Sequence, residues 1–250
     1  MNLLLVNDDG LHSPALWALA LGLSREHAVT VVAPANNCSA IGHGVTLHSP
    51  LFAHREDFPH GVPAWAVSGT PADCTRLGLM NFAPGPVDLV IAGPNRGCNL
   101  SQDLLYSGTV AAALEAAMMG VKAIALSAPI DADDHRTVET FLCIFDLLDL
   151  EQDFTEVLNI NIPALPLASV KGICWTPLGN NRWRGAYEKR PNPEPGFEGQ
   201  SLYHPPSHPP ERCPGSDNDY DRLYDGYITL TPLGYSLQQP IEGRRAIPWE

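Results

Sequence analysis

The sequence is poor in positive charge and has no long apolar run. Its 15 lysines and arginines stand against 28 aspartates and glutamates, which gives a formal net charge of -13. A protein that follows a nucleic-acid backbone needs a basic face, so we expect no nucleic-acid polymer as a partner. No stretch reaches about eighteen uninterrupted apolar residues, and the N-terminus carries no basic leader, so we expect neither a membrane span nor a signal peptide.

The chain also lacks the common cysteine and phosphate-binding motifs. Its six cysteines form no CxxC pair and no zinc-like spacing, so the simplest interpretation is a reduced cytoplasmic protein. Neither G-x-G-x-x-G nor G-x-x-x-x-G-K-[ST] occurs. Hydrophobic residues make up 44% of the 250 positions, which is enough for a substantial core. The length suits one large domain, or one domain with an appendage.

Through the first 165 residues, apolar runs of strand length alternate with helix-like segments. The predicted strands are 3–6, 28–33, 45–52, 64–67, 87–92, 121–126 and 158–162, and the predicted helices are 15–23, one that begins after Thr70-Pro71-Ala72-Asp73, 109–119 and one from residue 134. This alternation predicts an α/β fold, with a parallel sheet covered by helices on both faces. Ligands of such folds bind at the carboxyl ends of the strands.

The pattern changes after residue 165. Two more strands are expected at 172–176 and 226–231, and the eight prolines between Pro191 and Pro214 exclude an ordinary helix or central strand from that stretch. We expect a surface arm or flexible loop there, in preference to a substrate-contacting segment. The predicted organisation is therefore a catalytic core over 1–165 and a C-terminal extension over 166–250, with a proline-rich arm and a final strand.

Asp8 and Asp9 are the first candidates for chemistry, because they directly follow the predicted strand 3–6. Adjacent carboxylates repel each other unless a proton or cation lies between them, so a hard divalent ion is a natural ligand. The alternative is a solvated Asp-Gly turn, which this motif alone leaves about equally open.

Three further polar segments also follow predicted strands or begin a predicted helix. Residues 33–43 could turn main-chain N–H groups and the Ser39 hydroxyl toward an anion or metal, although an ordinary polar loop is the favoured interpretation of that segment alone. In 92–100, Asn95 offers a neutral oxygen to a cation and Arg96 is a candidate phosphate contact. Ser107 and Thr109 stand at a helix start, where N–H groups bind phosphate or the hydroxyls simply cap the helix.

Together these segments resemble the SurE family of stationary-phase survival-type nucleotide phosphatases. The resemblance rests on LLLVNDDGLHSPAL, VVAPANNCSAIGHGVTLH, VSGTPADC, VDLVIAGPNRGCNL and YSGTVAAALEA, in the family's order, and it continues weakly through NINIP and SDNDYDRLYDGYITLTPL. It implies a Rossmann-like core that binds one divalent ion per subunit, Mg²⁺ or Mn²⁺. The positions that match its metal ligands are Asp8, Asp9, Ser39 and Asn95. Those that match its phosphate site are Asn37, Ser107, Gly108 and Thr109.

The resemblance further implies hydrolysis of nucleoside 5'-monophosphates and sometimes 3'-monophosphates, and in some members of short polyphosphate. Family members typically form dimers or tetramers through C-terminal extensions, so we expect a homodimer or homotetramer. Ala15, Ala35, Cys38 and Pro94 depart from the family's usual residues. The expected metal ligands are intact, so we expect hydrolysis to be little affected by these changes. The loss of the basic residue usually found at position 38 removes a possible phosphate contact, which bears on substrate preference and turnover.

The expected mechanism is in-line attack on phosphorus by a water that either the ion or Asp8, as general base, activates; Asp8 as a covalent nucleophile is less favoured. The alternatives are a non-catalytic nucleotide-binding module and a phosphatase that acts mainly on short polyphosphate. A haloacid-dehalogenase-type phosphatase is disfavoured, because Gly10 stands where Asp-x-Asp needs its second acid. A sugar-nucleotide glycosyltransferase is disfavoured because it usually spans two such domains.

Overall fold

The computed structural model describes residues 1–181, 186–191, 199–205 and 209–236. Its strands are β1 (Asn2–Val6), β2 (Ala28–Pro34), β3 (Ala53–Asp57), β4 (Pro63–Val67), β5 (Leu89–Arg96), β6 (Ala123–Ala128), β7 (Val157–Asn161), β8 (Ile173–Trp175), β9 (Glu188–Arg190), β10 (Leu202–His204) and β11 (Ile228–Leu233). Its α-helices are α1 (Pro14–Leu23), α2 (Pro71–Leu77), α3 (Gly108–Met118), α4 (Asp134–Phe145) and α5 (Asp219–Tyr224). Short helical turns are η1 (Pro59–Gly61), η2 (Gly78–Phe82), η3 (Ser101–Tyr106) and η4 (Leu167–Ser169).

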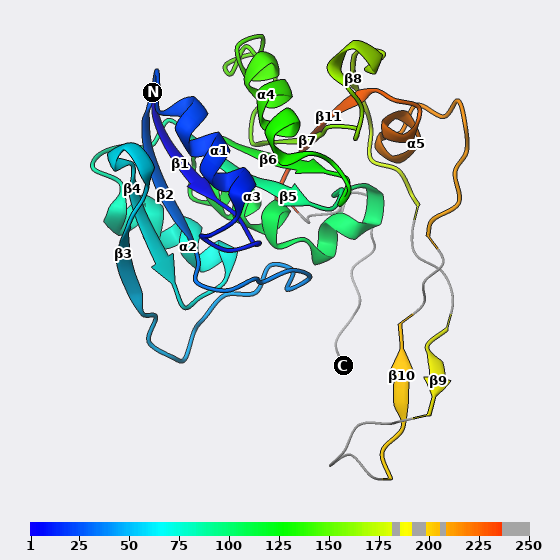
Figure 1. Cartoon of the computed structure of the whole chain (residues 1–250), viewed down its shortest axis with the longest axis horizontal. Helices are drawn as coiled ribbons and strands as arrows, with labels where there is room; N and C mark the ends of the chain where they lie inside the picture. Colours follow the sequence, from blue (N-terminus) through cyan, green and yellow to red (C-terminus); the bar gives the residue numbers. More distant parts are fainter. Residues whose placement is uncertain (182–185, 192–198, 206–208, 237–250) are drawn as a thin grey trace, which may run out of the picture.

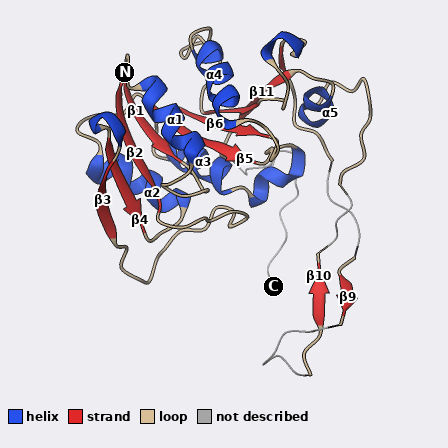
Figure 2. Ribbon diagram, in the orientation of Figure 1, coloured by secondary structure: helices blue, strands red, loops and turns tan. Residues whose placement is uncertain are grey.

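Nine of these strands form one sheet in the order β3-β4-β2-β1-β5-β6-β7-β11-β8. In this spatial order, each strand from β4 through β2, β1, β5 and β6 to β7 pairs in parallel with the next. Strand β3 runs antiparallel to β4, and β11 runs antiparallel to β7. The predicted α/β class with a mostly parallel sheet is confirmed, and Figure 2 shows the strands enclosed between helices. Since β8 and β11 join this sheet, part of the chain beyond residue 165 completes the core.

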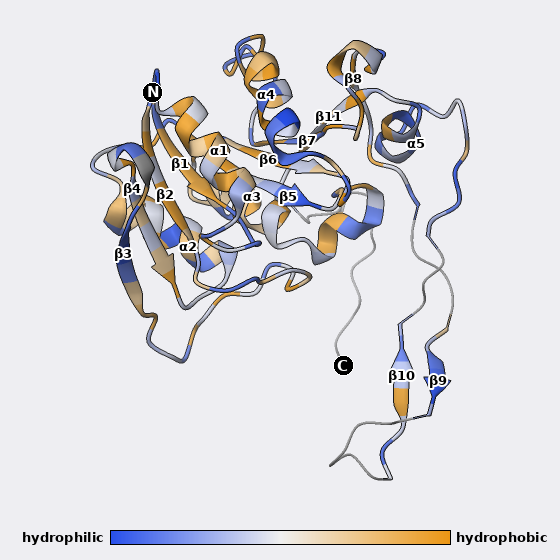
Figure 3. Ribbon diagram, in the orientation of Figure 1, coloured by the Kyte–Doolittle hydropathy of each residue, from blue (hydrophilic) through white to orange (hydrophobic). Residues whose placement is uncertain are grey.

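Helices cover both faces of the sheet, and β1 is therefore buried on both sides. Leu3 and Leu5 face the layer that contains α1 and α4, whereas Leu4 and Val6 face the layer of α2 and α3. Figure 3 shows the hydrophobic colour along β1 and β2 and on the neighbouring helix α1. A strand apolar at every position thus anchors the middle of the sheet, and its carboxyl end delivers Asp8 and Asp9 to one edge.

One predicted strand is wrong. Residues 45–52 form no strand, and the hairpin instead begins at Ala53, where β3 runs antiparallel to β4. The reason is that Thr46 uses its N–H and hydroxyl on the Asp73 carboxylate, at 3.0 and 2.7 Å, so the segment is tied to helix α2 rather than to a strand. Leu47 and Phe52 are accordingly exposed.

The proline-rich stretch carries only short strands in its described part. β9 and β10 pair with each other as a two-stranded ribbon, which lies apart from the main sheet in Figure 1. The remaining residues of this stretch, 192–198 and 206–208, lie outside the described residues. The expectation of an extended arm is met where the chain is described, and its use in assembly stays a prediction.

Candidate active site

The carboxyl ends of β2, β1 and β5, which are neighbours in the sheet, bring three predicted segments to one edge. Asp8 and Asp9 follow β1, the Ser39 loop (residues 35–46) follows β2, and Asn95 lies at the end of β5. Strand β5 extends past the predicted end at Ala92. Its register with β6 shifts between Ala92 and Asn95, and the pairing of the two strands then continues to Arg96. Gly93 permits that shift, since a Cβ there would lie 2.2 Å from the main-chain oxygen of Leu126.

Asp8 joins this edge to the start of helix α3. Its side chain is buried, with the residue 3% exposed, and accepts hydrogen bonds from the Thr109 hydroxyl at 2.6 Å and the Thr109 N–H at 3.2 Å. Its main-chain oxygen accepts from the Cys38 N–H at 2.7 Å. One residue therefore links β1, the Ser39 loop and α3, although 101 positions separate it from Thr109 in sequence.

The start of α3 approaches Asp8 closely because residue 108 is glycine. A Cβ at Gly108 would lie 2.9 Å from Asp8 Cβ and 3.0 Å from Asp8 Oδ2. Ser107 caps the helix through its hydroxyl, which accepts from the Val110 N–H at 3.0 Å. With the Thr109 N–H committed to Asp8, the Gly108 N–H is left without an acceptor in the described part of the chain. An unpaired N–H at a helix start is a group that can donate to an anionic oxygen.

Asp9 is half-buried and contacts both neighbouring segments. Its Oδ1 lies 3.4 Å from the Asn37 amide nitrogen, and its Oδ2 accepts from the Arg96 N–H at 3.3 Å. Asn37 in turn accepts the N–H of Ser39 at 2.9 Å, which places Ser39 beside it in an exposed position. The structure thus connects Asp9, Asn37 and Ser39 in one chain of contacts.

The Asn95 side chain is oriented by its own loop. Its amide nitrogen donates to the Gly97 oxygen at 2.7 Å, so its amide oxygen is the atom available to a cation. The edge therefore offers two carboxylates with a neutral amide and a hydroxyl oxygen. This donor set fits a hard divalent cation. The described residues contain no group of three or more His, Cys, Asp or Glu that could hold a metal, so any ion here relies on neutral oxygens as well.

Burial disfavours the ionised form of both Asp8 and Asp9. Burial raises the pKa of Asp8 above its ordinary value of 3.8, the Thr109 hydroxyl lowers it, and the charge of Asp9 raises it further. Burial likewise raises the pKa of Asp9, against the opposing effect of the Arg96 N–H and charge. Both shifts penalise the ionised pair, and a bound cation would remove that penalty.

The guanidinium of Arg96, a predicted phosphate contact, is paired with a carboxylate. Its Nε and Nη2 bind both carboxylate oxygens of Asp134, at 3.0 and 2.6 Å, at the start of α4. A phosphate contact from this side chain would require that pair to open, and the role stays a prediction. Cys38 is also no evident nucleophile, because burial and then the Asp8 charge raise the pKa of its thiol.

Sequence reasoning missed Asn99, which holds the connection between Asn95 and α3 in place. Its N–H donates to Asn161 Oδ1 at 3.0 Å, and its amide nitrogen donates to Ser127 Oγ at 2.8 Å. Its main-chain oxygen accepts from the Asn159 and Asn161 amides, each at 2.9 Å. The available signal was the pair of asparagines in the otherwise apolar strand β7, since buried amides need partners.

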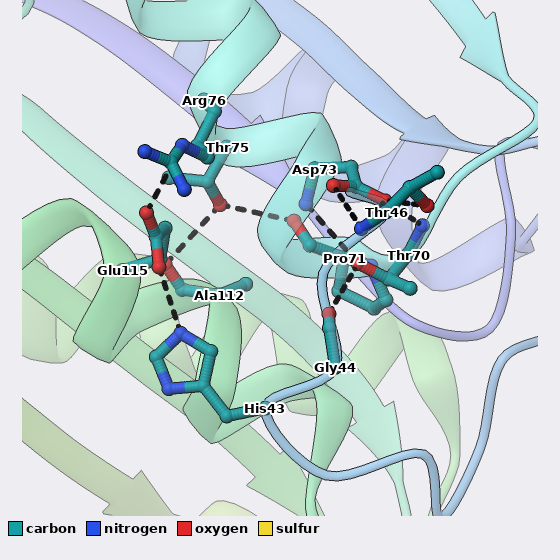
Figure 4. A network of polar contacts seen from close by, with 10 residues as sticks. All are labelled: His43, Gly44, Thr46, Thr70, Pro71, Asp73, Thr75, Arg76, Ala112 and Glu115. Carbon is teal, nitrogen blue, oxygen red and sulfur yellow. Dashed lines mark hydrogen bonds and ion pairs between the residues drawn. The ribbon is translucent and has the colours of Figure 1, made fainter. Parts of the chain in front are cut away.

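A polar network behind the Ser39 loop was missed as well (Figure 4). The Gly44 oxygen accepts the Thr70 hydroxyl at 2.7 Å, and His43 Nε2 lies 2.8 Å from Glu115 Oε2. In Figure 4 the buried Glu115 lies between His43 and Arg76, whose Nε is 3.4 Å away. The Ser39 loop is thus held by contacts to the start of helix α2 and to helix α3.

Comparisons with known proteins show which proteins this chain is similar to. The family model "Survival protein SurE" matches residues 3–185. A protein named 5'-nucleotidase SurE from Fervidobacterium nodosum is 41% identical, with 93% of this chain and 91% of that protein covered. One of the same name from Clostridium beijerinckii is 38% identical over 95% and 94%. The crystal structure of the SurE protein from Aquifex aeolicus is 32% identical, has a TM-score of 0.77 and is covered over 95% of both chains. No helix in the described residues is long and apolar enough to cross a membrane.

Proposed function

The chain belongs to the SurE family, and from this we propose that it is a metal-dependent 5'-nucleotidase, which hydrolyses nucleoside monophosphates to nucleoside and phosphate. Nucleoside 5'-monophosphates are the main proposed substrates and 3'-monophosphates a second class. The observation that carries the proposal is the contact between Asp8 and the start of α3. It sets a buried carboxylate beside the uncommitted Gly108 N–H, which is the pairing that phosphoryl transfer to water needs.

Asp8, Asp9, Ser39 and Asn95 are the residues proposed to hold one divalent cation, Mg²⁺ or Mn²⁺. When bound, such an ion supplies positive charge against the charge that builds on the transferring phosphoryl group. The chain has few alternatives for that purpose, because the guanidinium of Arg96, the arginine next to the site, is already paired with Asp134.

The protein groups then have separate tasks. Gly108 presents its N–H to a phosphoryl oxygen, and its missing Cβ lets the start of α3 lie close to Asp8. Asp8 accepts the proton of the attacking water, and its raised pKa, which comes first from burial, makes it a better acceptor than an exposed aspartate. Thr109 holds the Asp8 carboxylate in one orientation. Asn37 supports the same side of the site through its contacts with Asp9 and Ser39.

The test is phosphate release by the full chain from nucleoside 5'-monophosphates, 3'-monophosphates and short-chain polyphosphate, with added Mn²⁺ or Mg²⁺ and with a chelator. We expect release from the 5'-monophosphates, loss with chelator, recovery when metal is added back, and loss in Asp8→Asn. Nucleotide binding without release would establish a non-catalytic module instead. Release from polyphosphate alone would establish the other alternative.

A further inference from the structure

Asp219, at the first position of α5, is a fully buried carboxylate outside the candidate site, with 0% of the residue exposed. It accepts hydrogen bonds from the Ser101 N–H at 2.7 Å, the Ser101 hydroxyl at 3.0 Å, and the N–H groups of Gly179 and Tyr220, each at 2.8 Å. Two of these four bonds reach across 118 residues to one serine. A buried charge held by this many donors is costly to disturb.

Ser101 begins the turn that leads into the candidate phosphate site. Its φ of +52° lies in the left-handed region, which costs a residue other than glycine about 1 kcal/mol or more. Turn η3 runs from Ser101 to Tyr106, and Ser107 and Gly108 follow directly. The bonds that Asp219 accepts therefore hold the first residue of the turn that leads into α3.

The same junction contains the chain segment from which the proline-rich arm departs. A Cβ at Gly179 would lie 2.4 Å from Ser101 Oγ and 2.5 Å from Asn181 Oδ1, so a larger residue there would displace one or both side chains. The Gln102 N–H donates to the Asn181 oxygen at 3.4 Å. Turn η3 thus packs around Asp219 against residues 179–181, which precede the proline-rich arm and are called the root of the arm below.

Helix α5 also supports this connection through apolar contacts. Tyr220 and Leu223 pack with Leu100 and the partly buried Cys98, which are the residues just before Ser101. Residues 98–101 are therefore held by one short helix from the C-terminal part of the chain, through a carboxylate and an apolar face.

We propose that Asp219 is a positioning residue for phosphate binding, which orders Ser101 and η3 so that the Gly108 N–H meets the phosphoryl group. Because Asp219 also holds Gly179, the placement of the phosphate site depends on how the root of the arm is seated. The proposal deepens the proposed function and rests on it. Nothing in it requires Asp219 to touch substrate or metal.

The test uses the full chain and compares Asp219→Asn with Asp221→Asn. Asp221 is also 0% exposed and lies on the same helix, but it accepts from Cys213 and Asn218 rather than from Ser101. An asparagine at 219 keeps the shape and sets an N–H donor against Ser101 or Gly179. We expect Asp219→Asn to raise both the KM for a nucleoside 5'-monophosphate and the Kd for inorganic phosphate by about tenfold, as the loss of a bond to a charged group would.

Mn²⁺ affinity, measured with the metal alone, should stay within about twofold of wild type, because the proposed metal ligands are not moved. Asp221→Asn should leave all three quantities unchanged. Equal effects of the two variants, or weaker Mn²⁺ binding in Asp219→Asn, would indicate general loosening and overturn the proposal. Unchanged phosphate affinity in a folded Asp219→Asn would overturn it too.

Gly179→Ala disturbs Ser101 from the opposite side and provides a second variant should Asp219→Asn fail to fold. It should raise the phosphate Kd in the same way, and unchanged affinity would contradict the proposal. Failure of the proposed function is distinguishable, because wild type would then neither release phosphate from nucleotides nor bind inorganic phosphate. If wild type does both, the variants alone decide the role of Asp219.

Discussion

His43 Nε2 lies 2.8 Å from Glu115 Oε2, and this contact joins the Ser39 loop to the third turn of helix α3. The Glu115 side chain is 5% exposed, whereas that of His43 is 33% exposed. The Gly42 N–H donates to the Tyr106 oxygen at 2.9 Å beside it. The loop and the helix that carry the two halves of the candidate site are therefore tied to each other as well as to the sheet.

Breaking this tie should weaken metal binding. We expect Glu115→Gln to raise the Kd for Mn²⁺ several-fold and to destabilise the fold by about 1 kcal/mol, because a buried carboxylate loses its bonds to His43 and Arg76. Calorimetric titration with Mn²⁺ and urea unfolding measure the two effects. Glu139→Gln is the matched control, since its histidine pair with His135 is exposed, with side chains 68% and 80% accessible. Equal Mn²⁺ affinity in Glu115→Gln and wild type would contradict the anchoring role.

Gly108→Ala tests the close approach of α3 to Asp8. The added Cβ would lie 2.9 Å from Asp8 Cβ, so the helix start or the carboxylate must shift. A displacement on that scale should lower kcat/KM by about 100-fold, at a stability cost of about 1–3 kcal/mol. Gly85→Ala is the control, because its Cβ would meet nothing nearer than 3.9 Å. Steady-state kinetics of a folded Gly108→Ala with wild-type activity would show that the contact is irrelevant to catalysis.

Asp73 gives a prediction for the pH dependence of stability. Burial by itself raises its pKa, but the hydrogen bonds from Thr46 and Thr70 outweigh this, so the net pKa lies below the ordinary 3.8. A carboxyl whose pKa is lowered by folding stabilises the folded state above its unfolded pKa, and the contribution is lost as the pH falls through the folded pKa.

We therefore expect Asp73→Asn to lose about 0.5–2 kcal/mol at neutral pH, the usual range for a lost helix cap. The loss should shrink as the pH falls below 3.8. Urea unfolding of both proteins across this range measures the difference. A deficit that is independent of pH would show that the charge of Asp73 contributes nothing.

Local patterns were enough to predict the elements next to the site. The apolar run of β1 indicated a strand buried on both faces, and Thr70-Pro71-Ala72-Asp73 predicted the capping box that opens α2, which the structure confirms. Ser13-Pro14 correctly located the start of α1, although the Ser13 side chain makes no capping bond. These features depend on neighbours within a few residues, so sequence alone reveals them.

The contacts that complete the site join distant residues, and periodicity does not reveal them. Glu115 lies 72 positions from His43, and Asp219 lies 118 from Ser101. Strand β11 pairs with β7 through a connection of more than sixty residues, which no local signal specifies. The pairing of Arg96 with Asp134 joins residues 38 positions apart and was equally invisible in the sequence, and the phosphate role of Arg96 stays a prediction.

Thr109 should tune the pH range of the reaction through Asp8. Burial raises the pKa of Asp8 and the Thr109 hydroxyl, at 2.6 Å, lowers it, so removal of that hydroxyl should raise the pKa further. Asp8 acts as a base only when ionised. In Thr109→Val, a variant of similar shape, the acidic limb of kcat/KM should therefore move to higher pH, and the maximal rate should fall because the carboxylate is no longer held in one orientation.

Thr109→Ser retains the hydroxyl and should keep the wild-type limb. Rate profiles from about pH 4 to 9 measure both. A limb that stays in place in Thr109→Val, or moves equally in Thr109→Ser, would mean that the ionisation seen in the rate belongs to a group other than Asp8.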